Sequence, residues 1–356
     1  MQEKSALNVV DLFSGCGGLS YGLIQAGLKV LLGVDNDHDS LVTFEANHPG
    51  SKTTNLDLAD PQAAKKIIKE VGDKNIDIVV GGPPCQGFSL TGSRNIEDPR
   101  NKLYLSMFNI VNEIQPKAFL VENVAGMATL YGGKVKEDII SKFEGAGYNV
   151  TAKLLSAADY GVPQMRKRLV FVGIKKSIGS FNFPKPTTTP DNYVTCGEAI
   201  SDLPSRVYEQ GDEESSYTTG PTTSYQKKIR NGSKKLYNHV ASLHTDKVLR
   251  VISQVPEGGN HKDLPKGVGE HRNFHEAWTR YHSKRPSRTI DTGHRNHFHY
   301  EYNRIPTVRE NARLQSFPDD FRFYGSRTSQ NRQVGNAVPP LLSYNLGKEI
   351  KKVLNK

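Results

Sequence analysis

The strongest constraint on the fold is an alternation of short apolar runs with helical patterns between residues 7 and 174. The apolar runs cover residues 7–13, 30–34, 76–80, 118–121, 150–155 and 169–174. Strands that alternate with helices are typical of a parallel sheet covered by helices. The short gap between the last two runs contains Gly161 and Pro163 and predicts an antiparallel hairpin at the sheet edge. We therefore expect an α/β fold with a doubly wound, mostly parallel sheet.

Turn and capping residues indicate where the helices begin and end. Residues 14–18 predict a tight turn into a helix that stops at Gly27, and Asp60-Pro61 predicts an N-cap followed by a proline in the first helical position. A further helix is expected to end near Gly145. Thr195 and Glu198 have the spacing of a capping box, which predicts a short helix that ends near residue 203.

The pattern changes beyond residue 175. Residues 205–235 are polar and weakly periodic, which predicts a loop, and regular helical spacing returns only at the end of the chain. There Leu342, Leu346, Ile350 and Val353 form one apolar stripe, which needs a partner surface. The first domain is the simplest partner.

Positive charge is concentrated in one part of the chain. The 356 residues carry a net charge of +10, and residues 226–304 contain sixteen Lys and Arg against seven Asp and Glu. The same stretch holds nine of the eleven histidines, with aromatic residues between them. This mixture is typical of a nucleic-acid surface, although a solvated basic face is the alternative.

Several classes of protein are disfavoured. We find neither an apolar run of about 20 residues nor a secretion signal, so we expect a cytoplasmic location. The three cysteines are widely spaced, which argues against a disulfide framework and a structural zinc site. We expect Cys16 and Cys196 to be small buried residues.

Candidate site residues follow the ends of the expected strands. In doubly wound sheets a ligand lies where the strand order reverses, usually between the first and fourth strands. This places residues 15–18, Asp35, Cys85 and Glu122 around one crevice. A carboxylate such as Asp35 can accept from both ribose hydroxyls, which fits NAD, FAD and S-adenosylmethionine alike. The glycine turn lacks the third glycine of a pyrophosphate loop, which favours a cofactor without phosphates.

Cys85 follows two prolines at a strand end. Pro83 and Pro84 stiffen the loop and remove two backbone donors, so we favour a nucleophile over a buried structural cysteine. No cationic residue adjoins Cys85, and its activation must come from the fold or the substrate.

Six motifs follow one another along the chain: DLFSGCGG at 11–18, GPPCQGFS at 82–89, ENV at 122–124, QMRKR at 164–168, RPSRT at 285–289 and QVGNAVPP at 333–340. In this order they resemble the motifs of bacterial DNA (cytosine-5) methyltransferases of the restriction-modification type. The resemblance implies a class I S-adenosylmethionine-dependent methyltransferase fold with a smaller target-recognition domain. Residues 1–176 would be the catalytic and cofactor-binding domain, residues 177–325 the target-recognition domain, and residues 326–356 a C-terminal segment that returns to the catalytic domain, with the DNA cleft between the two domains.

The resemblance also implies the reaction. The target cytosine is flipped out of the duplex, Cys85 adds to C6, the methyl group passes to C5, and proton loss with β-elimination releases the enzyme. Glu122 would neutralise the charge that develops at N3, while Arg166 and Arg168 would hold O2 and the adjacent phosphate. The product of the cofactor is S-adenosylhomocysteine.

The remaining roles are implied residue by residue. Cofactor contacts are expected from Phe13, Ser14, Gly15, Gly17, Gly18, Asp35, Asn36, Asp57, Leu58, Pro83, Leu103, Asn336 and Val338. For Leu103 an ordinary core position remains open, and for Asn336 a helix N-cap. Substrate contacts are expected from Gln86, Ser89, Asn123, Gln164, Arg272, Arg280 and Arg288.

The expected recognition domain coincides with much of the basic stretch. Candidate DNA contacts there are Asn238, His239, Asn260, Lys262, Arg272, Asn273, Arg280 and His282, for each of which a phosphate-binding or structural role is the stronger alternative. His294, His297 and His299 alternate, but we expect no metal because the chemistry needs none. The expected partners are double-stranded DNA and a cognate restriction endonuclease without stable binding, and a monomer would suffice.

Three other functions remain to be weighed. An RNA methyltransferase could carry the same motifs, but the basic insertion favours duplex DNA. A catalytically silent DNA-binding regulator is disfavoured by the intact Cys85, Glu122 and Arg166. A nicotinamide-dependent dehydrogenase leaves the residues around Cys85 unexplained.

Overall fold

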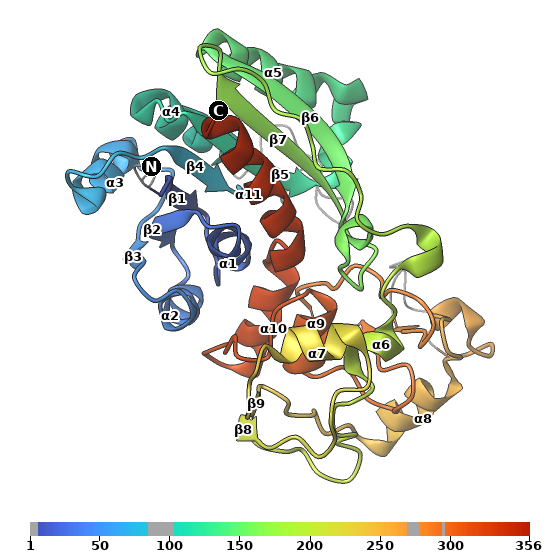
Figure 1. Ribbon diagram of the computed structural model, residues 1–356. Coiled ribbons are helices and arrows are strands. Elements are labelled where there is room, and N and C mark those ends of the chain that lie inside the picture. Colours follow the sequence, from blue (N-terminus) through green and yellow to red (C-terminus); the bar gives the residue numbers. More distant parts are fainter. Residues whose placement is uncertain (1–5, 85–102, 269–277, 294–295) are drawn as a thin grey trace. The chain divides into compact units, whose positions relative to one another are not determined.

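The computed structural model describes residues 6–84, 103–268, 278–293 and 296–356 (Figure 1). The chain forms two compact units. The first unit comprises Met1–Ser156, Lys167–Pro186 and Val338–Lys356, and the second comprises Ala157–Arg166 and Thr187–Ala337. The division into a catalytic domain, a target-recognition domain and a C-terminal segment, with boundaries after residues 176 and 325, stays a prediction.

The first unit contains a seven-stranded sheet with the order β3-β2-β1-β4-β5-β7-β6. Its strands are β1 (Asn8–Leu12), β2 (Lys29–Asp35), β3 (Lys52–Asn55), β4 (Ile78–Gly81), β5 (Ala118–Val124), β6 (Tyr148–Ser156) and β7 (Lys167–Lys175). The first five strands pair in parallel, whereas β7 pairs antiparallel with β5 and with β6. The strand order reverses between β1 and β4, as expected. The predicted α/β class and the antiparallel edge hairpin are both confirmed.

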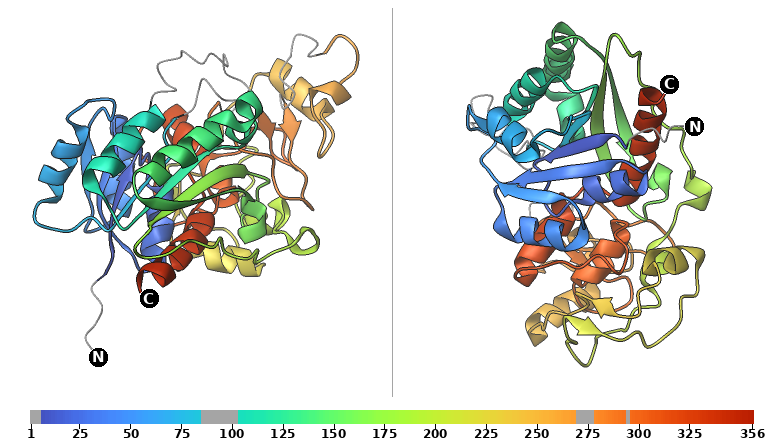
Figure 2. Two further views of the ribbon diagram at one scale, coloured as in Figure 1. Left: turned by 90° about the horizontal axis from the view of Figure 1, so that it is seen from above. Right: turned by 60° about the vertical axis from the view of Figure 1, so that its left-hand side comes forward.

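Helices cover both faces of this sheet (Figure 2). They are α1 (Gly18–Gln25), α2 (His38–Asn47), α3 (Ala63–Val71), α4 (Leu103–Ile114), α5 (Lys134–Gly145) and α11 (Pro340–Leu354). Helices α3, α4 and α5 lie on one face, and their apolar side chains form a core with those of the strands. Helix α3 begins at Ala63 rather than at Pro61, because Asp60 accepts from the Gln62 and Ala63 backbone N–H groups in a turn that precedes it.

Helix α11 packs against α1 within the first unit. Ser343 Oγ donates to the Gly18 carbonyl at 3.3 Å, and Lys351 Nζ donates to the Gly27 carbonyl at 3.0 Å. The helices approach closely at Gly347, where a Cβ atom would lie 2.8 Å from Leu23 Cδ2. The apolar stripe at the chain end therefore has its expected partner.

The second unit consists of short elements. It contains α6 (Cys196–Ile200), α7 (Ser224–Arg230), α8 (Asp246–Gln254), α9 (Val308–Leu314), α10 (Arg327–Asn336) and two strand pairs, β8 (Glu214–Ser215) with β9 (Leu236–Tyr237) and β10 (Thr279–Arg280) with β11 (His297–Phe298). The capping box of Thr195 and Glu198 is present at α6. The loop expected over residues 205–235 is wrong in part, because a second capping box, Thr223 with Gln226, starts α7. This helix is too short for its two buried apolar residues to produce a periodic pattern.

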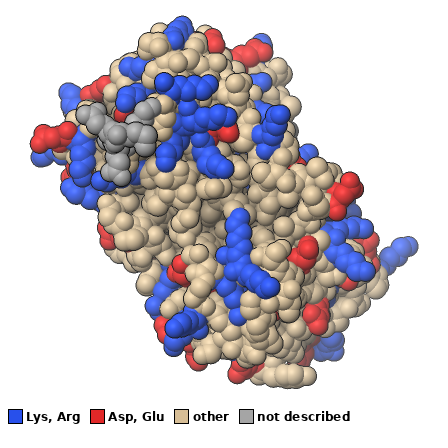
Figure 3. All heavy atoms as spheres, in the orientation of Figure 1, with Lys and Arg blue, Asp and Glu red and all other residues tan. Residues whose placement is uncertain are grey.

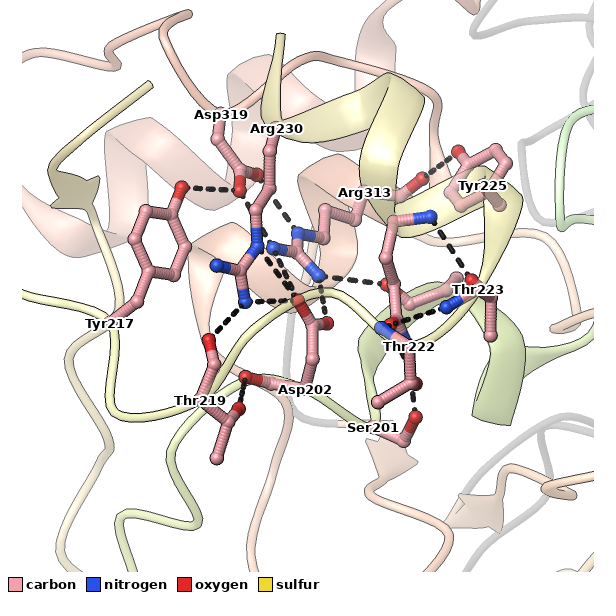
Figure 4. A network of polar contacts seen from close by, with 12 residues as sticks. Ser201, Asp202, Tyr217, Thr219, Thr222, Thr223, Tyr225, Arg230, Arg313 and Asp319 are labelled. Carbon is pink, nitrogen blue, oxygen red and sulfur yellow. Dashed lines mark hydrogen bonds and ion pairs between the residues drawn. The ribbon is translucent and has the colours of Figure 1, made fainter. Parts of the chain in front are cut away.

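Buried ion pairs hold part of the second unit together (Figure 4). Arg313 contacts both Asp202 and Asp319, and Arg230 lies 2.5 Å from Asp202. Tyr217 donates to Asp319 at 2.6 Å. Although burial disfavours the charged form of Asp319, Arg313 keeps the pKa of this carboxyl below its ordinary value. Removal of one partner would leave a buried charge unpaired, so this network is expected to be sensitive to substitution.

None of the helices in the described ranges combines the length and the apolar character that crossing a lipid bilayer requires.

Candidate active site

The turn after β1 has a left-handed backbone conformation at three positions, two of which are glycines. Phe13, Gly15 and Gly17 all have positive φ, at 54°, 52° and 89°. At Gly17 a Cβ atom would lie 2.2 Å from His48 Cε1, so the close approach of the α2 end excludes a side chain there. Among the described residues the buried hydroxyl of Ser14 has no hydrogen-bond partner. Ser14 thus provides one polar group for a ligand.

Asp35, at the end of β2, fastens this turn to the sheet. Its Oδ2 accepts from the Gly15 N–H at 2.8 Å, and its Oδ1 accepts from the Asn36 and Asp37 N–H groups at 2.8 and 2.9 Å. Burial raises the pKa of the Asp35 carboxyl above its ordinary value. A carboxylate offers about four lone-pair directions, so capacity for a ligand hydroxyl remains.

Four further expected cofactor residues follow the ends of β1, β2 and β3. Asn36 and Asp57 are exposed, Leu58 is buried, and Phe13 is half-buried against the core. Leu56, beside Asp57, donates its N–H to the Asp35 carbonyl at 3.0 Å, which joins the β3 end to the β2 end. The carboxylates of Asp35 and Asp57 would repel the phosphates of a dinucleotide but attract a positively charged sulfonium. Together with the Ser14 hydroxyl, they therefore fit S-adenosylmethionine.

Glu122 and Asn123 form the second half of the site. We expected both residues to follow the end of the strand, but they lie inside β5. The strand is longer than expected because β5 continues to pair with β7 as far as Val124. Glu122 Oε1 is 2.8 Å from Arg168 Nε. At Gly82 a Cβ atom would lie 3.2 Å from Glu122 Oε2, so the β4 end passes close to this carboxylate. Asn123 Nδ2 donates to the Pro83 carbonyl at 3.1 Å and so ties the β4 end to β5.

The expected site residues Cys85, Gln86 and Ser89 lie outside the described residues. Pro83, two residues before Cys85, is described and buried. Leu103 is half-buried in the first turn of α4.

Arg166 and Gln164 belong to the second unit, unlike the residues around Glu122. Arg166 is 1% exposed, and its Nη2 donates to the Gly335 carbonyl at 2.9 Å. Gln164 is fully buried, and its Oε1 accepts from the Ile290 N–H at 3.0 Å. In this structure the Arg166 guanidinium contacts backbone carbonyls, and its expected contact with the base or its phosphate stays a prediction. Asn336 is exposed at the C-terminal end of α10 and is not a helix N-cap, and Val338 is buried.

Arg280 does not have the exposure that a DNA contact needs. Its guanidinium is buried and donates to the carbonyls of Val255, Ile252 and His299 at 2.7, 2.6 and 3.0 Å. These contacts favour the structural role that the sequence left open, and we propose no substrate contact for Arg280.

Asn238 and His239 are also structural. Asn238 Nδ2 donates to the Phe323 carbonyl at 2.9 Å, and His239 lies between Thr307 Oγ1 and the Pro204 carbonyl. Burial lowers the pKa of His239 to about 4, so this imidazole is neutral at physiological pH.

The remaining recognition candidates are nearer the surface or cannot be placed. Lys262 and Arg288 are exposed, Asn260 caps a short turn through the Lys262 N–H, and His282 pairs with Glu257. Arg272 and Asn273 lie outside the described residues. On the face shown in Figure 3, Lys and Arg gather over α7 and over the C-terminal end of α11.

Two further predictions concern cysteine and histidine. Cys16 and Cys196 are buried free thiols, as expected, and burial raises the pKa of Cys16 to about 12. His297 stacks on Tyr281, whereas His294 lies outside the described residues. No group of three or more potential metal ligands occurs within the described ranges.

Sequence reasoning missed the segment around α9. Arg309, Glu310, Arg313 and Gln315 are each at most 1% exposed. The available signal was the capping box of Thr307 with Glu310. A capping box marks the start of a helix even where charged residues leave no apolar pattern.

Residues 7–352 match the model of the C-5 cytosine-specific DNA methylase family. The chain belongs to this family. It is a DNA (cytosine-5)-methyltransferase that uses S-adenosylmethionine.

Relatives match almost the whole chain. The type II methyltransferase M1.HphI of Haemophilus parahaemolyticus is 39% identical over 352 residues, which cover 98% of this chain and 87% of that protein. The type II methyltransferase M.DdeI of Desulfomicrobium norvegicum is 36% identical over 371 residues, covering 97% and 88%. A crystal structure described as a DNA modification methyltransferase encoded within an E. coli prophage superposes with a TM-score of 0.80 at 29% identity, over 99% of this chain and 100% of that chain. DNMT2 of Spodoptera frugiperda shares the fold alone, with a TM-score of 0.62 at 18% identity over 99% of this chain and 100% of that chain.

Proposed function

We propose that this DNA cytosine-5 methyltransferase acts through Cys85 as nucleophile and Glu122 as proton donor. The thiolate of Cys85 adds to C6 of a cytosine flipped out of the duplex, which makes C5 nucleophilic. The cofactor supplies an electrophilic methyl group when it is bound. Loss of the C5 proton then lets the C6–sulfur bond break, which restores the aromatic ring and the free thiol.

The observation that carries this proposal is the position of the Glu122 carboxylate. It lies on β5 beside the end of β4, and Arg168 contacts its Oε1. Addition of a thiolate at C6 moves negative charge to N3, where a carboxylic acid can donate a proton. Oε2 remains directed toward Gly82 and so faces the strand end that leads to Cys85. Arg168 then has two functions, orienting Glu122 and donating to O2 of the base.

Asn123 has a supporting part in this arrangement. Its hydrogen bond to the Pro83 carbonyl restrains the chain two residues before Cys85. A nucleophile must approach C6 within a narrow range of directions, so a restrained loop lowers the entropy lost in the reaction.

We propose the cofactor contacts residue by residue. In the first unit Asp35 binds the ribose, Asn36 and Asp57 the adenine, and residues 13–18 with Leu103 the methionine end. Asn336, exposed at the end of α10, provides a further contact. Asp35 supports the proposal best, because three backbone N–H groups fix its orientation.

We further propose that the enzyme protects bacterial DNA as the modification partner of a restriction endonuclease. Relatives named as type II methyltransferases, at 39% and 36% identity, support this role. Modification and cleavage require only a shared recognition sequence, so a cytoplasmic monomer without a stable endonuclease complex would suffice.

One experiment tests reaction, nucleophile and specificity together. A plasmid library with random inserts is recovered from cells that express the chain or its Cys85→Ser variant, and 5-methylcytosine is sequenced at base resolution. We expect methylation within one short motif, and none with the variant. Soluble protein that methylates no DNA would contradict the proposal and direct attention to RNA. Methylation by the variant would exclude Cys85 as nucleophile.

A further inference from the structure

The C-terminal end of α10 is held by side chains from other segments of the second unit. Gln315 Nε2 donates to the Val334 carbonyl at 3.1 Å and to the Ala337 carbonyl at 2.7 Å. Arg166 Nη2 donates to the Gly335 carbonyl at 2.9 Å. The last carbonyls of a helix lack partners in the helix and carry the negative end of its dipole, so amide and guanidinium donors stabilise this end.

Gln164 joins these two donors into one network. Its Nε2 donates to Gln315 Oε1 and its Oε1 accepts from the Ile290 N–H at 3.0 Å. Arg166 Nη1 also reaches the Ile290 carbonyl, at 3.4 Å. The backbone after Ile290 packs so closely on the helix end that a Cβ atom at Gly335 would lie 2.5 Å from the Asp291 carbonyl oxygen.

The network is buried, whereas the residue beside it is exposed. Gln164 and Gln315 have no exposed surface and Arg166 has 1%, but Asn336, which follows Gly335, is exposed. Buried side chains that donate to backbone carbonyls restrict the backbone to arrangements that keep these hydrogen bonds. Here the backbone that they fix is the one that carries Asn336.

We infer that Gln315, Gln164 and Arg166 form an anchor that fixes the end of α10 and thereby holds Asn336 in place for the cofactor. This inference rests on the proposed cofactor contact of Asn336. In this inference Arg166 is a positioning residue. Arg168, the second arginine of the motif at residues 164–168, is the one that contacts Glu122.

The test measures cofactor affinity in the absence of DNA. S-adenosylhomocysteine is titrated calorimetrically into the full chain and into the variants Gln315→Met, Arg166→Lys and Asn336→Ala. Methionine fills the volume of glutamine but cannot donate, and lysine keeps the charge but loses the fork. We expect each variant to bind about tenfold more weakly. The double variant Gln315→Met with Asn336→Ala should bind no more weakly than Asn336→Ala alone, because both changes remove the same contact.

Two matched variants control for a general loss of stability. Gln226 is fully buried, accepts from the Thr222 N–H at 2.7 Å and donates to Ser201 Oγ at 3.0 Å. Arg309 is equally buried and donates to the carbonyls of Pro318 and Phe321. Neither residue donates a side-chain hydrogen bond to the α10 end. Gln226→Met and Arg309→Lys should keep S-adenosylhomocysteine affinity within about twofold of the parent.

Hydrogen exchange provides the second readout. The backbone amides of residues 334–337 should exchange faster in Gln315→Met and Arg166→Lys than in the two controls. Parent-like affinity in Gln315→Met, with weaker binding in Asn336→Ala, would overturn the anchor and leave the proposed contact of Asn336 intact. Parent-like affinity in Asn336→Ala would remove that contact and the inference with it. Equal losses in the control variants would also overturn the inference.

Discussion

The guanidinium Nε of Arg168 lies 2.8 Å from Glu122 Oε1, and the two side chains are only 12% and 10% exposed. They come from β7 and β5, which pair antiparallel, and Arg168 is opposite Val124 in that pairing. The antiparallel strand beside β5 therefore has a chemical consequence. It brings an arginine to the carboxyl end of a parallel strand, where it contacts the carboxylate that we propose as proton donor.

Replacing Glu122 with Gln should lower kcat by about 10²- to 10⁴-fold, because an amide cannot give a proton to N3. The rate of methyl transfer to a duplex oligonucleotide, with both substrates saturating, measures this effect. Asp77 provides the control, since it pairs with Lys117 at 2.8 Å just before the same two neighbouring strands begin. Asp77→Asn should keep kcat within about twofold of the parent, at some cost in stability. Parent-like turnover by Glu122→Gln would contradict the role of Glu122.

Replacing Asn123 with Ala should slow formation of the covalent bond to the base by about tenfold, because the Pro83 carbonyl loses its hydrogen bond. The measurement is the rate at which duplex DNA that contains 5-fluorocytosine becomes covalently attached in the presence of the cofactor. Asn149 is a matched control, since its Nδ2 donates to the Gly179 carbonyl at 2.7 Å. If Asn149→Ala slows trapping as much as Asn123→Ala does, the effect is general destabilisation and the role of Asn123 is wrong.

The sheet could be predicted from the sequence because burial on both faces produces continuous apolar runs. Strand β4, for example, is fully buried along Ile78–Gly81. Strand ends were less predictable. The polar pair Glu122 and Asn123 looks like a loop, but pairing with β7 continues through both residues. A sequence pattern read along one strand contains no information about where the neighbouring strand stops.

The second unit was predicted less well, because it is held together by polar contacts. Arg309 and Arg313 have no exposed surface, and a single sequence cannot distinguish such buried arginines from surface ones. The same difficulty affects the charge count. Arg230, Arg280 and Arg304 belong to the basic stretch but bind internal carboxylates or carbonyls, so fewer charges face a ligand than the sequence indicates.

Replacing Gly17 with Ala should destabilise the first unit by about 2–4 kcal/mol, since the new Cβ atom combines a positive φ with contact to His48 and Phe44. It should also weaken S-adenosylhomocysteine binding. Gly50 separates the two causes, because its φ is +88° but a Cβ atom there would have no neighbouring atom within 4 Å. Gly50→Ala should cost about 1 kcal/mol and leave binding unchanged. Urea unfolding and calorimetry measure both quantities, and equal losses in the two variants would exclude the steric explanation.

Asp11 should make the stability of the first unit depend on pH. This residue lies on β1 with 1% exposure, and Ser20 donates to its Oδ2 at 2.6 Å. Burial raises the pKa of Asp11 from 3.8 to about 7, so the folded chain holds a proton that the unfolded chain releases. The stabilisation is complete below about pH 4 and is lost as pH rises to about 7, with a total change of at most about 4 kcal/mol. Asn cannot titrate, so Asp11→Asn should remove this slope, whereas Asp57→Asn, at an exposed position, should retain it. Urea unfolding of the ligand-free chain between pH 4 and 8 measures the slope, and identical slopes for the parent and Asp11→Asn would show that Asp11 is not its source.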